Sequence, residues 1–173
     1  GEIGIIAANT RTPEKVRGDL RAQRSALRVG ELRLMELVAR YGRHTIFAAT
    51  TRGVYVSEDR GKTWQARNQG LLNQFVSCLL LDPKQDRRLL AGTEAGLYES
   101  FNEGKEWTLV AFAEIPIRAL LREPESWPGI YWVGTEYHGL FESFDGGEKF
   151  DQVDMGSDSV SIYALAGGGG ERV

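Results

Sequence analysis

The chain has 173 residues, of which 42% are hydrophobic and 26% are charged, a composition typical of a globular protein. This length suits one domain with a substantial core, and no apolar run approaches the roughly 20 residues of a membrane-spanning helix. Cys78 is the single cysteine, which excludes an intrachain disulfide and an all-thiolate zinc site. Because the two histidines, His44 and His138, are far apart in the chain, we expect no bound metal and no cofactor.

The charge is distributed unevenly along the chain. Residues 11–43 carry nine Lys/Arg and four Asp/Glu, whereas residues 44–173 carry twelve Lys/Arg and nineteen Asp/Glu. Two unlike segments therefore follow one another. We expect a basic segment over residues 1–42 and a second, acidic domain over residues 43–173.

The basic segment has the pattern of a helix. Thr12 is a suitable N-cap, Pro13 suits the first helical position, and Gly42 is a natural C-terminal stop. Apolar residues recur at intervals of three and four between these ends, which predicts a helix over residues 12–41. Its arginines are expected to form a solvated face. Aromatic residues are not interleaved with them and the rest of the chain is acidic, so we expect no nucleic-acid partner.

Residues 11–42 resemble a fragment of the hydantoinase B/oxoprolinase family. The resemblance lies in Arg-Gly-Asp-Leu-x-Ala-Gln at residues 17–23 and Leu-Val-x-Arg-Tyr-Gly at residues 37–42. It implies shared ancestry with enzymes that open cyclic amides with ATP or carboxylate their substrates. No catalytic residue transfers over so short a stretch, and an accessory role in such a system is a further alternative function.

The acidic segment contains an internal repeat. Ser57, Ser100 and Ser143 are 43 residues apart, and Gly53, Gly96 and Gly139 repeat with the same spacing. A period of 40–50 residues made of short β-rich runs is typical of propeller blades. We therefore predict an all-β fold of about three four-stranded blades, with strands A to D, preceded by the N-terminal helix.

The turn between strands C and D carries the most specific motif. It resembles the Asp-box, or BNR, repeat Ser-x-Asp-x-Gly-x-Thr-Trp of sialidases, other glycosidases, sortilin-type receptors and photosystem II assembly factors. The resemblance implies that these residues stabilise the turn and do not catalyse. The matching positions are Ser57, Asp59, Gly61 and Trp64; Ser100, Asn102, Gly104 and Trp107; and Ser143, Asp145, Gly147 and Phe150.

The strand order suggests an incomplete ring. The repeats run B-C-D, A-B-C-D, A-B-C-D and then a final A strand over residues 160–166, so the first blade lacks an A strand. Propellers close with roughly four to eight blades, so three blades do not close alone. Either two chains form a six-bladed homodimer by exchanging the last A strand, or the chain belongs to a longer propeller.

The loops between strands B and C supply the candidate binding residues. They share one end of the blades with the D–A loops, opposite the Asp-box turns, and the third loop has one extra residue. The candidates are Arg52, Glu94, Glu136, Tyr137 and His138. We expect a non-catalytic module that binds a protein or a saccharide there, with no catalytic residue.

The main alternative is a fragment of a BNR-type glycoside hydrolase, in which Glu94 and Glu136 would be the pair of acids. Sialidases of this class use an Arg-Ile-Pro motif, whereas here Ile115, Pro116 and Arg118 have these residue types in the wrong order. The sialidase interpretation is therefore disfavoured. The single cysteine and the absence of a recognisable leader weakly favour a cytoplasmic location.

Overall fold

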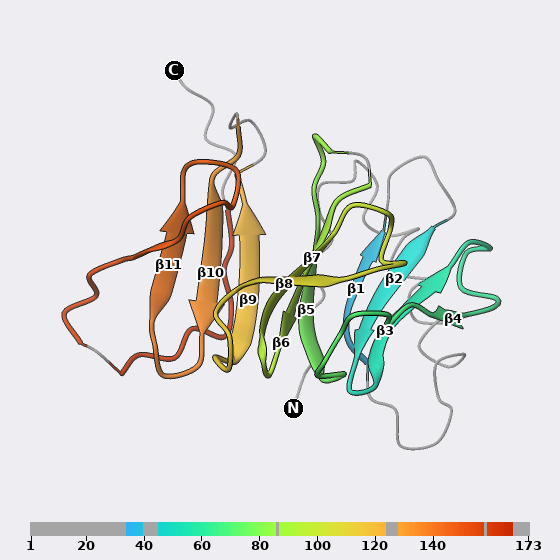
Figure 1. The fold of residues 1–173 in the computed structure, drawn as a ribbon, viewed down its shortest axis with the longest axis horizontal. Helices are drawn as coiled ribbons and strands as arrows, with labels where there is room; N and C mark the ends of the chain where they lie inside the picture. The colour runs from blue at the N-terminus through green and yellow to red at the C-terminus, as the bar shows by residue number, and fades with distance from the viewer. Residues whose placement is uncertain (1–33, 40–44, 86, 124–127, 158, 168–173) are drawn as a thin grey trace.

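The computed structural model describes residues 34–39, 45–85, 87–123, 128–157 and 159–167. These residues form three four-stranded antiparallel sheets that stand side by side (Figure 1), and none of them is in a helix. The first sheet contains β1 (Leu34–Ala39), β2 (Ile46–Thr50), β3 (Gly53–Ser57) and β4 (Gln65–Ala66). The second contains β5 (Val76–Leu81), β6 (Leu89–Thr93), β7 (Gly96–Ser100) and β8 (Thr108–Ala111). The third contains β9 (Ile117–Arg122), β10 (Tyr131–Thr135), β11 (Leu140–Ser143) and β12 (Asp151–Gln152).

Each sheet is a simple meander in which the strands pair in chain order. The first strands of neighbouring sheets contact each other, β1 with β5 and β5 with β9, and form the inner side of the array. This arrangement is that of propeller blades, which we number one to three along the chain. The all-β prediction and the strand positions B, C and D are therefore confirmed.

The predicted helix is wrong over its last residues, because residues 34–39 form strand β1 and pair with β2. The rest of the predicted helix lies outside the described residues. A β-bulge explains the misleading pattern: Leu34 pairs with Thr50 and Glu36 with Ala49, so Met35 is an extra residue. After such a bulge the alternation of side chains shifts by one, so residues three apart share a face, as they do on a helix.

Strand β1 is the A strand that the first blade was predicted to lack. The chain thus holds three complete blades in the order A-B-C-D. The place in blade one that the exchanged strand of a second copy was predicted to take is occupied by β1. The homodimer itself stays a prediction. So does the division of the chain at residue 42, because most of the basic segment lies outside the described residues.

The final A strand, predicted over residues 160–166, is not a strand in the structure. The segment nevertheless approaches blade three as the next inner strand would. Ile162 Cγ2 lies 2.7 Å from where a Cβ on Gly134 would stand, and Ile117 Cγ2 lies equally close to the matching point on Gly92. Residue 162 therefore corresponds in place to Ile117, the first residue of β9, whereas the predicted strand begins two residues earlier, at residue 160.

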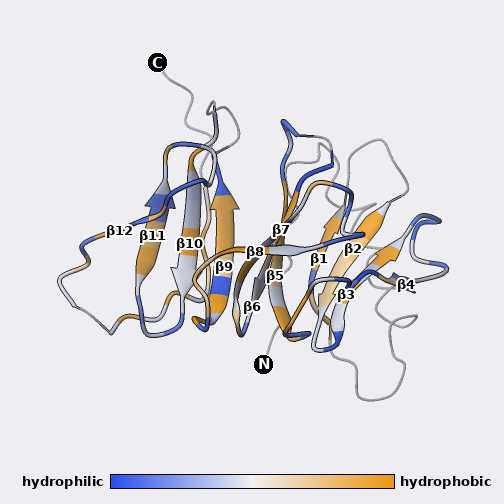
Figure 2. Cartoon of the chain, in the orientation of Figure 1, coloured by the Kyte–Doolittle hydropathy of each residue, from blue (hydrophilic) through white to orange (hydrophobic). Residues whose placement is uncertain are grey.

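The core lies between the blades. One apolar cluster joins blades one and two through residues such as Phe47, Val54, Leu79 and Leu89, and a second joins blades two and three. Hydrophobic colour in Figure 2 is concentrated on strands such as β2 and β9, whereas many of the turns are hydrophilic. Cys78 is buried in the second cluster, and burial raises the pKa of its thiol. In the part of the chain described, no helix is long and apolar enough to cross a membrane.

Candidate functional site

The candidate binding residues lie in the turns between strands B and C, at one end of the three blades. Each B strand ends in a buried threonine whose hydroxyl closes the turn. Thr50, Thr93 and Thr135 donate to the carbonyl oxygens of Gly53, Gly96 and Gly139 at 2.8, 2.9 and 2.7 Å. The residue that follows each threonine is thereby held at the rim of the blade.

Two of these rim residues are glutamates that bind the same arginine. Arg118 Nη1 lies 2.6 Å from Glu94 Oε1, and its Nη2 lies 3.0 Å from Glu94 Oε2, which makes a two-point contact. Its Nε lies 2.9 Å from Glu136 Oε2, which also accepts a hydrogen bond from Nη2. Arg118 thus joins the B–C turns of blades two and three.

A second β-bulge directs Arg118 toward these turns. Ile117 pairs with Thr135 and Ala119 with Gly134, so Arg118 is the extra residue on β9. Ser77 of β5 and Met35 of β1 occupy the same bulged position in their blades. A bulge changes the direction of a side chain, and here it places a cation between two carboxylates.

The charges of the cluster stabilise one another. Hydrogen bonds from Arg118 lower the pKa of Glu136, and hydrogen bonds to Glu94 and Glu136 raise the pKa of the guanidinium despite its partial burial. Glu136 is therefore ionised at neutral pH. The cluster is a preformed ion-pair system with one more negative than positive charge.

Two tyrosines and a histidine flank the cluster. The Tyr163 hydroxyl donates to Glu136 Oε1 at 3.3 Å, and the backbone N–H of Tyr137 donates to Ser161 Oγ at 3.0 Å. His138 Nδ1 lies 2.9 Å from the Glu136 carbonyl oxygen. Tyr137 and Tyr163 are each 62% exposed. The surface therefore combines exposed aromatic rings with planar polar groups. We call these six residues the rim cluster: Glu94, Arg118, Glu136, Tyr137, His138 and Tyr163.

The structure brings together four of the five predicted binding residues. Glu94 and Glu136 are joined by Arg118, while Tyr137 and His138 lie beside them. Arg52 lies in the matching turn of blade one and is not part of the ion-pair group around Arg118. The backbone carbonyl oxygen of Arg52 accepts a hydrogen bond from Asn68 Nδ2 at 3.4 Å. Arg118 and Tyr163 were not among the predicted binding residues. The bulge, which no residue pattern marks, brings Arg118 to this end of the blade.

The predicted structural turns lie at the opposite end and share one hydrogen-bond pattern. Ser57 Oγ bonds Asp59 and accepts from the Gly61 N–H, while Asp59 Oδ1 accepts from the Thr63 N–H at 2.9 Å. Asn102 and Asp145 make the equivalent bonds in the other two turns. These residues are engaged within their own turns. That the turns belong to the Asp-box class stays a prediction.

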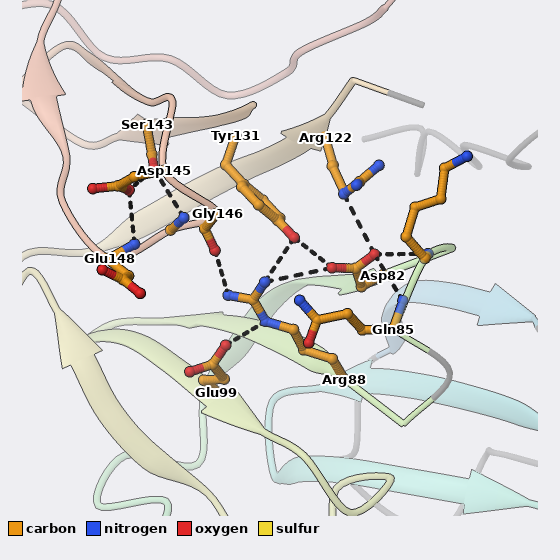
Figure 3. A network of polar contacts seen from close by, with 12 residues as sticks. Asp82, Gln85, Arg88, Glu99, Arg122, Tyr131, Ser143, Asp145, Gly146 and Glu148 are labelled. Atoms are coloured by element: carbon orange, nitrogen blue, oxygen red, sulfur yellow. Dashed lines mark hydrogen bonds and ion pairs between the residues drawn. The ribbon is translucent and has the colours of Figure 1, made fainter. Parts of the chain in front are cut away.

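A buried polar network lies at the same end, between blades two and three (Figure 3). The Tyr131 hydroxyl donates to Asp82 and accepts from Arg88 Nη1 at 2.9 Å, while Arg88 Nη2 donates to the Gly146 carbonyl at 2.7 Å. Asp82 and Arg88 are at most 6% exposed. The network joins the A–B loop of one blade to the C–D turn of the next, and its groups have partners inside the protein. It holds the blades together and offers no open site.

No metal site is found in the described part of the chain, since no group of three or more His, Cys, Asp or Glu side chains there could hold an ion.

Comparisons with known proteins agree on the fold. An ancestral GH74 enzyme superposes with a TM-score of 0.61 at 21% identity, over 68% of this chain and 18% of its own. The extracellular domain of a hybrid two-component system from B. thetaiotaomicron gives 0.59 at 18% identity, over 76% of this chain and 18% of its own. A computationally designed protein gives 0.59 at 12% identity, over 82% of this chain and 84% of its own. These likenesses show a propeller-type fold. The chain spans about a fifth of the length of the first two proteins.

The family comparison is partial. The model of the hydantoinase B/oxoprolinase family matches residues 2–63, well under half of the chain. The match extends past the stretch in which the sequence resembles that family and includes strands β1 to β3. No curated protein matches the chain.

Proposed function

We propose that the chain is a non-catalytic binding module that recognises a saccharide through its rim cluster. The observation that carries the proposal is Arg118, which holds the carboxylates of Glu94 and Glu136 side by side at the ends of two blades. The three polar side chains are held in place before a ligand binds, so binding costs little side-chain conformational entropy.

The chemistry of the cluster suits sugars. Carboxylates accept paired hydrogen bonds from neighbouring hydroxyls, and exposed aromatic rings pack against the apolar faces of sugar rings. Tyr137 and Tyr163 supply such rings beside the charged groups. A protein partner would use the same surface. A pull-down with competing sugars distinguishes protein binding from saccharide binding.

A glycoside hydrolase fragment is the second candidate, because one of the similar structures is a GH74 enzyme. Glycosidases need one protonated carboxyl group with a raised pKa to donate to the leaving oxygen. Here hydrogen bonds from Arg118 lower the pKa of Glu136, and Arg118 binds Glu94 at two points. This arrangement favours binding over acid catalysis.

Saccharide binding is tested by titrating the full chain with a panel of oligosaccharides and following its amide signals by NMR. We expect shifts at Glu94, Arg118, Glu136 and Tyr137, and a loss of affinity of at least tenfold in Tyr137→Ala. Phe144→Ala is the matched control, since Phe144 is 58% exposed but lies in the C–D turn of blade three, at the opposite end. Equal losses in both variants, or shifts that avoid the rim cluster, would contradict the proposal.

The hydrolase alternative has its own test. Turnover of aryl glycosides that disappears in Glu94→Gln or Glu136→Gln would replace the binding function with a catalytic one. A pull-down in which proteins bind through the rim cluster and sugars do not compete would favour a protein partner instead.

A further inference from the structure

The hydrogen-bonding capacity of the rim cluster is unequal, because most of its donors are already used. A guanidinium group has five N–H donors. Four of those of Arg118 point to Glu94 and Glu136: one from Nε, one from Nη1 and two from Nη2. Arg118 therefore contributes little donor capacity to a ligand.

The Glu94 carboxylate keeps acceptor capacity. Each carboxylate has about four acceptor positions. Glu94 uses two of them for Arg118, whereas Glu136 uses two for Arg118 and one for Tyr163 and is also bonded by the Tyr137 side chain. A ligand over the cluster meets more acceptors than donors.

His138 adds to this imbalance. A carbonyl oxygen only accepts, so the 2.9 Å contact between His138 Nδ1 and the Glu136 carbonyl places the proton on Nδ1. In the neutral ring Nε2 is then another acceptor. The net charge of the two glutamates and one arginine is also negative.

We infer that the rim cluster takes an uncharged saccharide that presents neighbouring hydroxyl groups, and that it discriminates against sugars bearing carboxylates. This inference rests on the proposed saccharide-binding function. Sugar hydroxyls donate into the open acceptor positions of Glu94 and into Nε2 of His138. A carboxylate would bring further acceptors and a like charge to a surface where Arg118 is already neutralised.

Calorimetric titration with matched pairs tests the inference. The probes are β-1,4-linked glucose oligosaccharides and the same oligomers oxidised to carboxylates at C6, with a second pair of neutral and carboxylated galactose oligomers. We expect the neutral member of a pair to bind at least tenfold more tightly in 50 mM NaCl, with a smaller difference in 500 mM NaCl, because salt screens the repulsion.

The outcomes separate the two proposals. Carboxylated oligomers that bind as tightly as neutral ones, or more tightly, would overturn the inference and leave saccharide binding standing. If neither member of any pair binds, the proposed function fails and the inference fails with it.

A pair of variants locates the effect. Glu94→Gln removes one negative charge from the cluster and adds a donor. The ratio of the affinities for neutral and carboxylated sugars should therefore fall several-fold. Glu58→Gln is the matched control: it makes the same charge change in the C–D turn of blade one, where Glu58 pairs with Arg67. Equal narrowing in both variants would show an effect of overall charge and would also overturn the inference.

Discussion

At the scale of single residues, one side-chain oxygen in each C–D turn holds the backbone of that turn through a hydrogen bond. In each turn the Oδ1 atom of Asp59, Asn102 or Asp145 accepts from the backbone N–H four residues later. Asparagine therefore replaces aspartate without loss of this bond. The charge of Asp59 matters for its own titration, because hydrogen bonds from the Thr63 side chain and backbone lower its pKa to about 2.

Removing the Thr63 hydroxyl should raise the pKa of Asp59. Its Oγ1 donates to Asp59 Oδ2 at 2.6 Å, and this bond favours the ionised form. A lowered pKa contributes stability above the ordinary value of 3.8, which is lost as the pH falls toward 2. In Thr63→Ala we expect the pKa, measured by NMR titration of the carboxyl carbon, to move toward 3.8. Thr108→Ala, in the exposed strand β8, should leave it unchanged; an unchanged value in Thr63→Ala would contradict the assignment.

Glu36 should give the chain a pH-dependent stability of the opposite sign. Its carboxylate accepts from the Leu79 N–H at 2.6 Å across the inner strands of blades one and two, and burial raises its pKa to about 7. The folded state therefore binds more protons than the unfolded state between pH 4.5 and 7, and stability falls as the pH rises through this range.

Glu36→Gln keeps an acceptor for Leu79 and removes the charge. We expect it to abolish the fall in stability and to be more stable than the parent at pH 8, by up to about 3 kcal/mol. Urea denaturation at pH 5 and pH 8 measures both effects. Glu142→Gln, on β11 of blade three, is the control for a simple change of charge. A parent protein with equal stability at the two pH values would refute the argument.

At the scale of elements, the network between blades two and three should contribute to stability through the Tyr131 hydroxyl. This hydroxyl bonds both Asp82 and Arg88, and Tyr131 is 1% exposed. Tyr131→Phe leaves the buried carboxylate of Asp82 with one partner fewer, which costs about 1–3 kcal/mol. Denaturant unfolding measures the loss. Tyr98→Phe, at a residue equally buried in β7, should cost clearly less; equal costs would show that the network does not stabilise the packing of the blades.

The elements also show what the sequence could predict. The 43-residue spacing of the serines located strands B and C and their turns, because the turn residues recur with each blade. Strand β1 was predicted as helix because the bulge at Met35 gives Leu34 and Leu37 a helix-like separation on one face. A bulge also explains why only part of the rim cluster was predicted. Glu94 and Glu136 were visible as turn residues, whereas the position of Arg118 depends on a bulge that only the pairing of β9 with β10 reveals.

At the scale of the whole molecule, three blades form an open array, and propellers close with roughly four to eight blades. Two copies would supply six blades if blade three of each copy packed on blade one of the other. The segment around Ile162 already lies where the inner strand of a following blade would stand, against Gly134. A partner's β1 would therefore compete with this segment for the same place.

The competition gives self-association a specific test. Ile162→Ala removes Cγ2, the Ile162 atom nearest the point where a Cβ on Gly134 would stand, so it should weaken the packing of this segment on blade three and strengthen dimer formation. Light scattering over a hundredfold range of concentration should show a particle of twice the 19.2 kDa chain mass, formed at lower concentration in the variant than in the parent. Tyr163→Phe is the control, because it removes only the hydroxyl bonded to Glu136 and keeps the contact at Gly134. If the parent and Ile162→Ala both remain monomers, strand β1 of a second copy does not displace the segment around Ile162. This face of blade three would then be closed by that segment.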